Sequence, residues 1–122
     1  MKLGIIGCGA IGSDVATAAD KMKEIKRIYL YDLKKEVSQK LCKSLKKAEV
    51  KPVKDFLIDV DVVFEAASQK AVEEYAEMII LAGKDMVIMS VGSLYNNKFK
   101  KKLENIAREK NCKIYLPSGA VC

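Results

Sequence analysis

The chain has 122 residues and a mass of 13.5 kDa, with half of its residues hydrophobic and 31% charged, a composition that indicates one globular domain and argues against intrinsic disorder. No apolar stretch approaches the roughly 20 residues of a membrane-spanning helix, and the N-terminus lacks a signal-peptide pattern, so we expect a cytoplasmic protein without a membrane partner. The net charge of +6 comes almost wholly from lysine, since Arg27 and Arg108 are the only arginines, and lysines spread over helix faces are typical of solvated surface, so no nucleic-acid partner is expected.

The first predicted elements alternate between strand and helix. Residues 3–6 are apolar, as expected of a strand buried on both faces of a parallel sheet. The next segment is helical by spacing, and its apolar stripe is formed by Ile11, Val15, Ala19 and Met22. A second strand covers residues 27–31. The helix after it has a lysine-rich solvent side and an apolar side formed by Val37, Leu41, Leu45 and Ala48.

The second half of the chain continues this alternation. Pro52 marks a break, and residues 50–53 form a short candidate third strand. Further strands are predicted at residues 62–65, 86–89 and 113–116. The two helices between them have apolar stripes formed by Val72, Ala76, Ile79 and Ile80 and by Phe99, Leu103, Ile106 and Ala107.

This order of elements predicts the fold class. Strands that alternate with helices require parallel pairing with right-handed crossovers. We therefore predict an α/β fold: a Rossmann-type doubly wound parallel sheet of about six strands with helices on both faces. No linker, repeat or low-complexity stretch interrupts the chain, so residues 1–122 are expected to form a single dinucleotide-binding domain.

The four cysteines do not indicate a metal site. Cys8, Cys42, Cys112 and Cys122 contain no C-x-x-C pair, and the chain has no histidine. Neither a zinc site nor a disulfide framework is predicted, and reduced thiols are expected.

The segment Gly-Cys-Gly-Ala-Ile-Gly at residues 7–12 stands directly between the first strand and the first helix. In this context G-x-G-x-x-G is typical of a dinucleotide-binding turn. Gly7 permits the tight turn, Gly9 lets a diphosphate approach the backbone, and Gly12 lets helix and strand pack closely. The helix N-terminus supplies free N–H groups and partial positive charge to the phosphates.

Asp32 ends the second strand, about twenty residues beyond the last glycine, where a carboxylate can accept hydrogen bonds from an adenosine ribose. Its negative charge favours NAD, because it would repel the 2′-phosphate of NADP. Lys34 and Lys35 follow at once and could reach a phosphate, or they could be ordinary surface charges at the start of a helix. NADP therefore stays possible.

Small residues follow the two later strands, at the sheet edge where ligands bind in open α/β folds. Ala66, Ala67 and Ser68 come after the strand at 62–65, and Ser90 and Gly92 come after the strand at 86–89. Both segments are candidates for close contact between the cofactor and the protein backbone. Both could instead be helix N-caps and ordinary tight loops.

Two other residues are weaker candidates. Glu65 stands at a strand end and could touch a ligand. Cys8 lies at a helix start, where the pKa of a thiol can fall, but no histidine is available to activate it. We interpret Cys8 as a small filler.

The second half of the chain contains four short motifs: EAAS at residues 65–68, GKD at 83–85, SVGSL at 90–94 and PSGA at 117–120. Together with Ala71-Val72 and Tyr75-Ala76 they resemble the NAD(P)-dependent L-aspartate dehydrogenases, and the resemblance covers essentially the whole chain. PSGA is the most specific of the four. All four are shared in part with relatives of homoserine dehydrogenase and dihydrodipicolinate reductase.

The resemblance implies an oxidoreductase that interconverts L-aspartate and iminoaspartate and supplies NAD biosynthesis, with NAD as cofactor and NADP possible. It also implies that Ala120 of PSGA lies by the nicotinamide. The full set of residues predicted to bind the cofactor is Gly7, Gly9, Ala10, Ile11, Gly12, Asp32, Leu33, Ala66, Ala67, Ser68, Ser90, Gly92 and Ala120.

The sequence departs from this family in length. Family members are about twice as long, and a second α+β domain after PSGA contributes the catalytic histidine, most substrate contacts and much of the dimer interface. This chain has no histidine and stops at Val121-Cys122, so we expect a truncated chain that lacks the catalytic domain, binds a dinucleotide and has little or no dehydrogenase activity. An amino or imino acid substrate and a homodimer are expected only of the full-length protein, and no catalytic residue is assigned. The alternative is a naturally short protein.

Two other functions remain open. A nucleotide-sensing module of the kind that gates potassium transport also begins with a strand, G-x-G-x-x-G, a helix and an acid, and its length suits this chain. The PSGA motif has no evident use in such a sensor. A dehydrogenase acting on homoserine or on a dihydrodipicolinate-like substrate is the second alternative.

Overall fold

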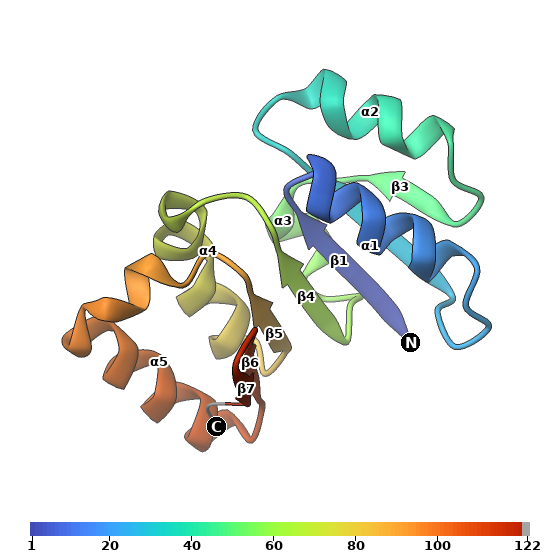
Figure 1. Cartoon of the computed structure of the whole chain (residues 1–122). Coiled ribbons are helices and arrows are strands. Elements are labelled where there is room, and N and C mark those ends of the chain that lie inside the picture. The colour runs from blue at the N-terminus through green and yellow to red at the C-terminus, as the bar shows by residue number, and fades with distance from the viewer. Residues whose placement is uncertain (121–122) are drawn as a thin grey trace.

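A computed structural model of the chain describes residues 1–120, except for the side chains of residues 119 and 120, so Cys122 lies outside the described residues. Strands and helices alternate along the chain (Figure 1). The strands are β1 (Lys2–Ile6), β2 (Arg27–Tyr31), β3 (Ala48–Val50), β4 (Val62–Glu65), β5 (Asp85–Ile88), β6 (Ile114–Leu116) and β7 (Gly119–Ala120). The helices are α1 (Ala10–Asp20), α2 (Lys35–Lys43), α3 (Val53–Phe56), α4 (Gln69–Leu81), the 3-10 helix η1 (Val91–Tyr95) and α5 (Asn97–Lys110).

The strands form one sheet in the order β3-β2-β1-β4-β5-β6-β7. The first six are parallel to their neighbours, as predicted, and Ile5 of β1 lies opposite both Leu30 and Phe64. β7 is a two-residue strand antiparallel to β6, which the alternating pattern does not predict. The strand order reverses at β1, so the carboxyl ends of β1 and β4 flank the switch point where open α/β sheets bind ligands.

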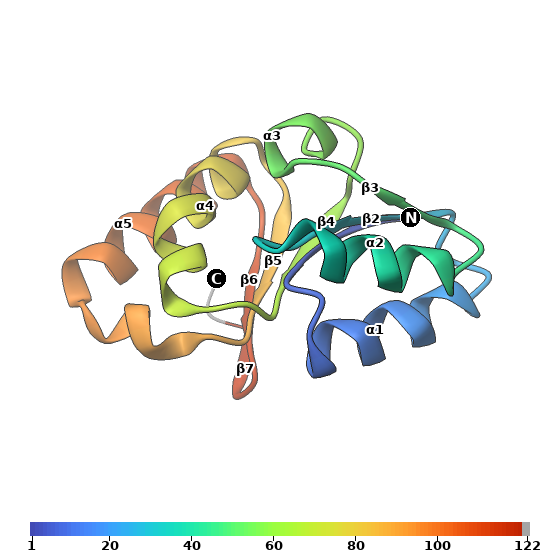
Figure 2. The same ribbon diagram turned by 90° about the horizontal axis from the view of Figure 1, so that it is seen from above.

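Helices cover the two halves of the sheet on opposite faces. α1 and α2 pack on the half that contains β1, β2 and β3, while α4 packs on β4 and β5 with α5 beside it (Figure 2). Successive strands are added on one side of β1 in the first half of the chain and on the other side in the second half. Right-handed crossovers therefore place the helices of the two halves on opposite faces. Within residues 1–120, none of the helices combines the length and apolarity needed to cross a bilayer.

Each face of the sheet carries its own core. The core beneath α1 and α2 includes Leu3, Ile5, Ile28, Leu30, Ala16 and Ala19. The core beneath α3, α4 and α5 includes Ile6, Phe56, Val63, Ile79, Met86 and Leu103.

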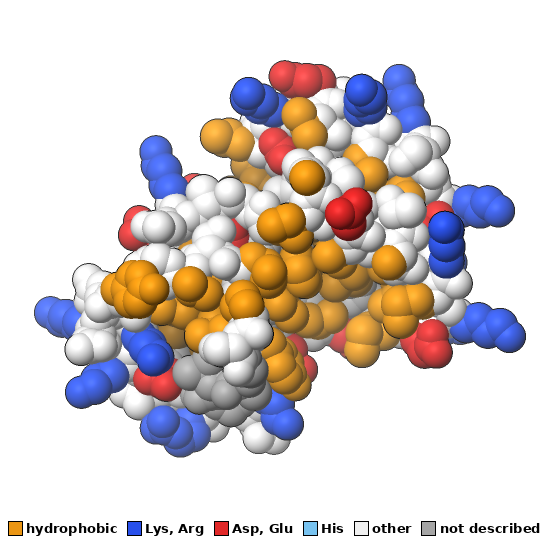
Figure 3. Space-filling model, in the orientation of Figure 1, with side chains coloured by type: hydrophobic (Ala, Val, Ile, Leu, Met, Phe, Trp, Pro, Cys, Tyr) orange, Lys and Arg blue, Asp and Glu red, His pale blue; other side chains and the backbone are white. Residues whose placement is uncertain are grey.

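One face of the C-terminal half has no helix over it among the described residues. Val62, Phe64 and Val87 point to this face and are only half-buried, whereas Val63 and Met86 on the α4 side are fully buried. In the orientation of Figure 1, hydrophobic side chains gather on this side of the molecule (Figure 3). These strands are therefore apolar on both faces although helices cover only one.

The third strand is displaced from its predicted position. β3 is Ala48–Val50, and residues from Val53 begin α3, with Pro52 as the N-cap. The fixed φ of proline suits the start of a helix, so the break at Pro52 opens a helix where the pattern predicted a strand. α2 ends at Lys43, so Leu45 and Ala48 do not belong to the apolar side of the second helix.

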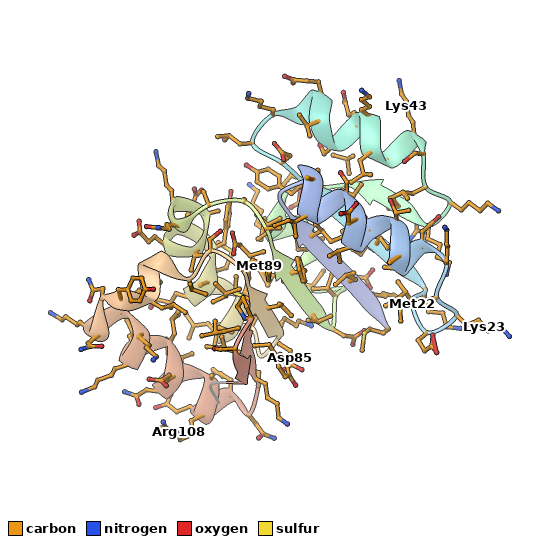
Figure 4. All side chains as sticks on the ribbon, in the orientation of Figure 1. Met22, Lys23, Lys43, Asp85, Met89 and Arg108 are labelled. Atoms are coloured by element: carbon orange, nitrogen blue, oxygen red, sulfur yellow. The ribbon has the colours of Figure 1, made fainter. Side chains whose placement is uncertain are left out.

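The apolar stripe predicted for the first helix is wrong in part. The buried residues of α1 are Gly12, Ala16 and Ala19, while Ile11 and Met22 are 51% and 46% exposed. The small residues face the sheet and let the helix approach it closely, while Ile11 lies on the solvent side of the helix. Met22 lies beyond the last turn of α1, at the end away from the glycine turn (Figure 4).

Candidate functional site

The glycine turn lies at the carboxyl end of β1, at the switch point of the sheet. Gly7 has a φ of +96°, and a Cβ on it would lie 2.6 Å from the carbonyl oxygen of Ala66. A Cβ on Gly12 would overlap the carbonyl oxygen of Gly7 and lie 2.9 Å from its carbon, whereas a Cβ on Gly9 would meet no atom within 4 Å. The first and third glycines are therefore needed for the turn's own packing, and the second leaves open space beside the backbone.

Backbone donors of α1 point out of the helix at the same place. Gly9 is the N-cap, and its carbonyl oxygen accepts the N–H of Ser13 at 2.8 Å. The N–H groups of Ala10, Ile11 and Gly12 precede this first helical bond, so they have no acceptor within the helix. The first turn also contains no acidic residue. Free donors and the positive end of the helix dipole favour an anion such as a diphosphate here.

Asp32 follows β2, and its carboxylate is anchored to the glycine turn. Its Oδ2 accepts the N–H of Cys8 at 2.8 Å, and its Oδ1 accepts the N–H of Lys34 at 2.9 Å. Each oxygen keeps a further lone pair, with which it can accept a ribose hydroxyl. Lys34 and Lys35 are exposed. The structure thus brings Asp32 and the glycine turn together, and their contact with a cofactor stays a prediction.

A cavity of about 200 Å³ opens beside Asp32, between the end of β2 and the start of α4. Its lining is mainly apolar and aromatic and includes Tyr31, Leu33, Ala67, Ala71 and Tyr75. The two tyrosine rings meet edge to face with centroids 5.8 Å apart. Burial, and then the hydrogen bond to the Tyr31 hydroxyl, raise the pKa of Tyr75, so this hydroxyl stays neutral. The size and lining suit a flat aromatic ring such as adenine.

The motif analysis predicted Leu33 and Ala67 near the cofactor and missed both tyrosines. Tyr31 ends a strand and Tyr75 lies within α4, positions where an aromatic residue is usually assigned to the core. The four-residue spacing from Ala71 to Tyr75 places both side chains on one face of α4. That spacing was the one feature of the sequence from which Tyr75 could have been predicted beside the cofactor.

The small-residue loops after β4 and β5 leave the sheet at the same edge as the glycine turn. Asp85 and Met89 mark the two ends of β5 in Figure 4, and the chain continues from the Met89 end into η1. Ser68 is the N-cap of α4, and its Oγ accepts the N–H of Ala71 at 3.1 Å. The Ser68 hydroxyl therefore caps the N-terminus of α4, which was the alternative interpretation of this loop.

The second loop is also engaged with the protein. The N–H and the hydroxyl of Ser90 both donate to the carboxylate of Glu65. Gly92 lies in η1, where a Cβ would overlap the side chain of Gln69. Whether these loops also contact a cofactor stays a prediction. The role of Ala120 also stays a prediction; this residue lies in β7 and pairs with Tyr115 of β6.

The thiol of Cys8 is not a reactive group at this site. Cys8 is buried, and burial, followed by the nearby charge of Asp32, raises the pKa of its thiol to about 12. This agrees with its interpretation as a small filler. Cys42 is also a free thiol. Among residues 1–120, no group of three or more His, Cys, Asp or Glu residues is arranged to hold a metal ion.

Comparison with known proteins identifies relatives of this chain. It is 39% identical to the L-aspartate dehydrogenase of Methanosarcina barkeri and 42% identical to that of Methanocaldococcus jannaschii, over 99% of its own length in both cases. Each alignment covers 46% of the relative. The chain therefore spans about half the length of these relatives.

Solved structures share the fold. The aspartate dehydrogenase of Thermotoga maritima has a TM-score of 0.68 at 24% identity and is matched over 98% of this chain and 46% of its own. GenD2 from gentamicin A biosynthesis, solved in complex with NAD, has a TM-score of 0.81 at 18% identity, over 95% of this chain and 34% of its own. These likenesses confirm the predicted Rossmann-type fold.

A family model described as the NAD binding domain of homoserine dehydrogenase matches residues 7–117. The match includes the glycine turn, Asp32 and both small-residue loops. It confirms the prediction of an NAD-binding domain, and this chain belongs to the family of homoserine dehydrogenase NAD-binding domains.

Proposed function

We propose that this chain is the cofactor-binding half of an L-aspartate dehydrogenase, which oxidises L-aspartate to iminoaspartate. The observation that carries the proposal is the 39–42% identity to L-aspartate dehydrogenases along almost the whole chain. Because the chain spans 46% of those relatives, we assign the substrate-binding and catalytic groups to a second half of the protein. A homodimer of the full-length protein remains part of the proposal.

The residues of the site fit NAD in one orientation. The diphosphate would lie on the N–H groups of Ala10, Ile11 and Gly12, over the open space beside Gly9. Asp32 would accept hydroxyls of the adenosine ribose, and the adenine would enter the cavity lined by Tyr31 and Tyr75 with Leu33 beside it. When bound, NAD supplies the hydride acceptor.

The other half of the dinucleotide would extend over the β4 and β5 side. A doubly wound sheet consists of two mononucleotide-binding halves, and a dinucleotide crosses the crevice between them. The loop with Ala66, Ala67 and Ser68, which also borders the adenine cavity, and the loop with Ser90 and Gly92 would then line the path to the nicotinamide, and Ala120 would lie near it. In this chain their task is to hold the ring in place, since a positioned nicotinamide is what a substrate domain requires.

NAD is the preferred cofactor in this proposal. The carboxylate of Asp32 is fixed by hydrogen bonds from two backbone N–H groups, so it cannot easily turn away from a 2′-phosphate. The negative charges of the carboxylate and the phosphate would then repel each other. We expect NADH to bind at least about tenfold more tightly than NADPH. Equal affinities would show that Lys34 and Lys35 offset the carboxylate, and Lys34→Ala and Lys35→Ala variants would then weaken NADPH binding alone.

The chain and a chimera together test the proposal. Calorimetric or fluorescence titration should give saturable NADH binding by the chain, with no L-aspartate-dependent formation of NADH. A chimera of residues 1–120 followed by the second half of the Methanosarcina barkeri enzyme should form NADH from L-aspartate and not from homoserine. Turnover by the chain alone at an ordinary enzyme rate would contradict the division of labour, and an inactive chimera that binds NADH would favour a nucleotide sensor.

A further inference from the structure

Glu65 is the last residue of β4 and is 0% exposed. Burial of a carboxylate is costly unless hydrogen-bond donors surround it. Its strand neighbours Val63 and Phe64 are apolar, so nothing in the strand itself provides those donors. The donors must come from the loops that begin where β4 and β5 end.

Five donors from two loops meet this one side chain. Oε2 accepts the N–H groups of Ala67 at 2.8 Å and Ser68 at 3.0 Å, and the hydroxyl of Ser90 at 2.6 Å. Oε1 accepts the N–H groups of Met89 at 3.0 Å and Ser90 at 2.9 Å. The carboxylate therefore links the loop after β4 to the loop after β5, and each loop gives it at least two hydrogen bonds.

These are the two loops assigned above to the path toward the nicotinamide, and the first of them also borders the adenine cavity through Ala67 and Ser68. Glu65 itself has no exposed surface, so it does not reach the ligand. Hydrogen bonds to a charged group are stronger than neutral ones and fix the geometry of both partners. A loop held at two backbone N–H groups cannot rotate without breaking at least one of them.

We propose that Glu65 is a positioning residue, which holds the loops after β4 and β5 in the arrangement that receives the nicotinamide. This inference rests on the proposed placement of the cofactor. The adenosine and diphosphate half depends mainly on the glycine turn and Asp32, which have no hydrogen bond to Glu65 among the bonds of residues 1–120, although Ala67 and Ser68 also line the adenine cavity. The two halves of the site should therefore respond differently when Glu65 is changed.

The test compares Glu65→Gln with the unchanged chain and with Glu77→Gln as the matched control. Glutamine keeps the shape of the side chain but presents an NH₂ group to donors that need an acceptor. Glu77 is a partly exposed residue of α4 that forms an ion pair with Lys102 at 3.0 Å. Both variants are titrated with NADH and with ADP, which carries the adenosine and the diphosphate without a nicotinamide.

We expect Glu65→Gln to weaken NADH binding about tenfold or more and ADP binding by a clearly smaller factor of about threefold or less, since ADP meets only the first of the two loops, with both affinities unchanged in Glu77→Gln. Glu65→Asp keeps the charge but is too short to reach both loops, so it should lose NADH affinity in the same selective way. Equal loss of ADP and NADH, or unfolding of both Glu65 variants, would overturn the positioning role and leave a structural one. Undiminished NADH binding by Glu65→Gln would also overturn it. If the unchanged chain binds ADP and not NADH, the proposed function fails instead.

Discussion

Replacement of Gly12 by alanine should separate α1 from the sheet. The new Cβ would overlap the carbonyl oxygen of Gly7 and lie 2.9 Å from its carbon. Non-bonded carbon atoms pack at roughly 3.5–4.0 Å, so helix and strand must move apart by about 1 Å. Such overpacking costs about 1–3 kcal/mol, and alanine returns about 1 kcal/mol through its better helix propensity. Because the overlapped atoms belong to the backbone, the cost lies at the upper end of that range, and we expect the free energy of unfolding to fall by about 2 kcal/mol in net terms.

Gly9→Ala is the matched control for this variant. No atom lies within 4 Å of its Cβ position, and its φ of −76° is open to any residue. The free energy of unfolding should therefore stay within about 0.5 kcal/mol of the unchanged chain. NADH should nevertheless bind at least about tenfold more weakly, because the methyl group occupies the space through which the diphosphate reaches the backbone.

Two measurements separate these effects. Urea unfolding gives the free energy of unfolding, and NADH fluorescence gives the dissociation constant. Gly12→Ala should lose both stability and affinity, and Gly9→Ala should lose affinity alone. An unchanged urea midpoint for Gly12→Ala would refute the packing argument, and ordinary NADH binding by Gly9→Ala would refute the placement of the diphosphate.

Three further predictions concern stability. The Oγ of Ser93 is buried without a hydrogen-bond partner among residues 1–120, so Ser93→Ala should preserve or raise the urea midpoint, and a clear decrease would contradict this. Met86 is fully buried and Val87 only half-buried, so Met86→Ser should cost about 3 kcal/mol and Val87→Ser about 1 kcal/mol in the same unfolding assay; equal costs would show that both strand faces are covered. Hydrogen bonds from the backbone N–H groups of Lys46 and Lys47 lower the pKa of Asp20, and those from the Lys2 ammonium and the Tyr29 hydroxyl lower the pKa of Asp59. A depressed folded-state pKa stabilises the fold above the ordinary carboxyl pKa and loses that effect as the pH falls, so the urea midpoint should drop between about pH 5 and pH 2, and less steeply when both residues are asparagine.

The order of the main elements was predictable because strands and helices differ in the pattern of their apolar residues. Apolar runs of three or four residues marked five of the parallel strands, and the stripe at Val72, Ala76, Ile79 and Ile80 is buried in α4 as predicted. The third strand was misplaced because its three residues, Ala48 to Val50, include the charged Glu49 and form no apolar run. The first helix was misjudged because its buried residues are Gly12, Ala16 and Ala19, and small residues carry little weight in a hydrophobic stripe.

The two halves of the candidate site differ in how they could be found from the sequence. The adenosine and diphosphate half follows from one contiguous turn and one acid, Asp32, whose spacing is part of a known motif. The adenine cavity was only partly predictable, because Tyr31 and Tyr75 come from a strand and a helix 44 residues apart. Their contact depends on how α4 packs over the sheet, which local periodicity does not define.

The nicotinamide half depends on register between strands. Glu65 lies opposite Ile88 in the pairing of β4 with β5, and this places Ser90 just past the strand end, where both its N–H and its hydroxyl reach the carboxylate. A one-residue slip would turn the acid to the other face of the sheet and leave five donors without their acceptor. The acid at the end of an apolar strand was visible in the sequence, but its partners were not. The pairing of β4 with β5 therefore decides whether Glu65 faces ligand, solvent or neighbouring loops, and in this fold it faces the loops.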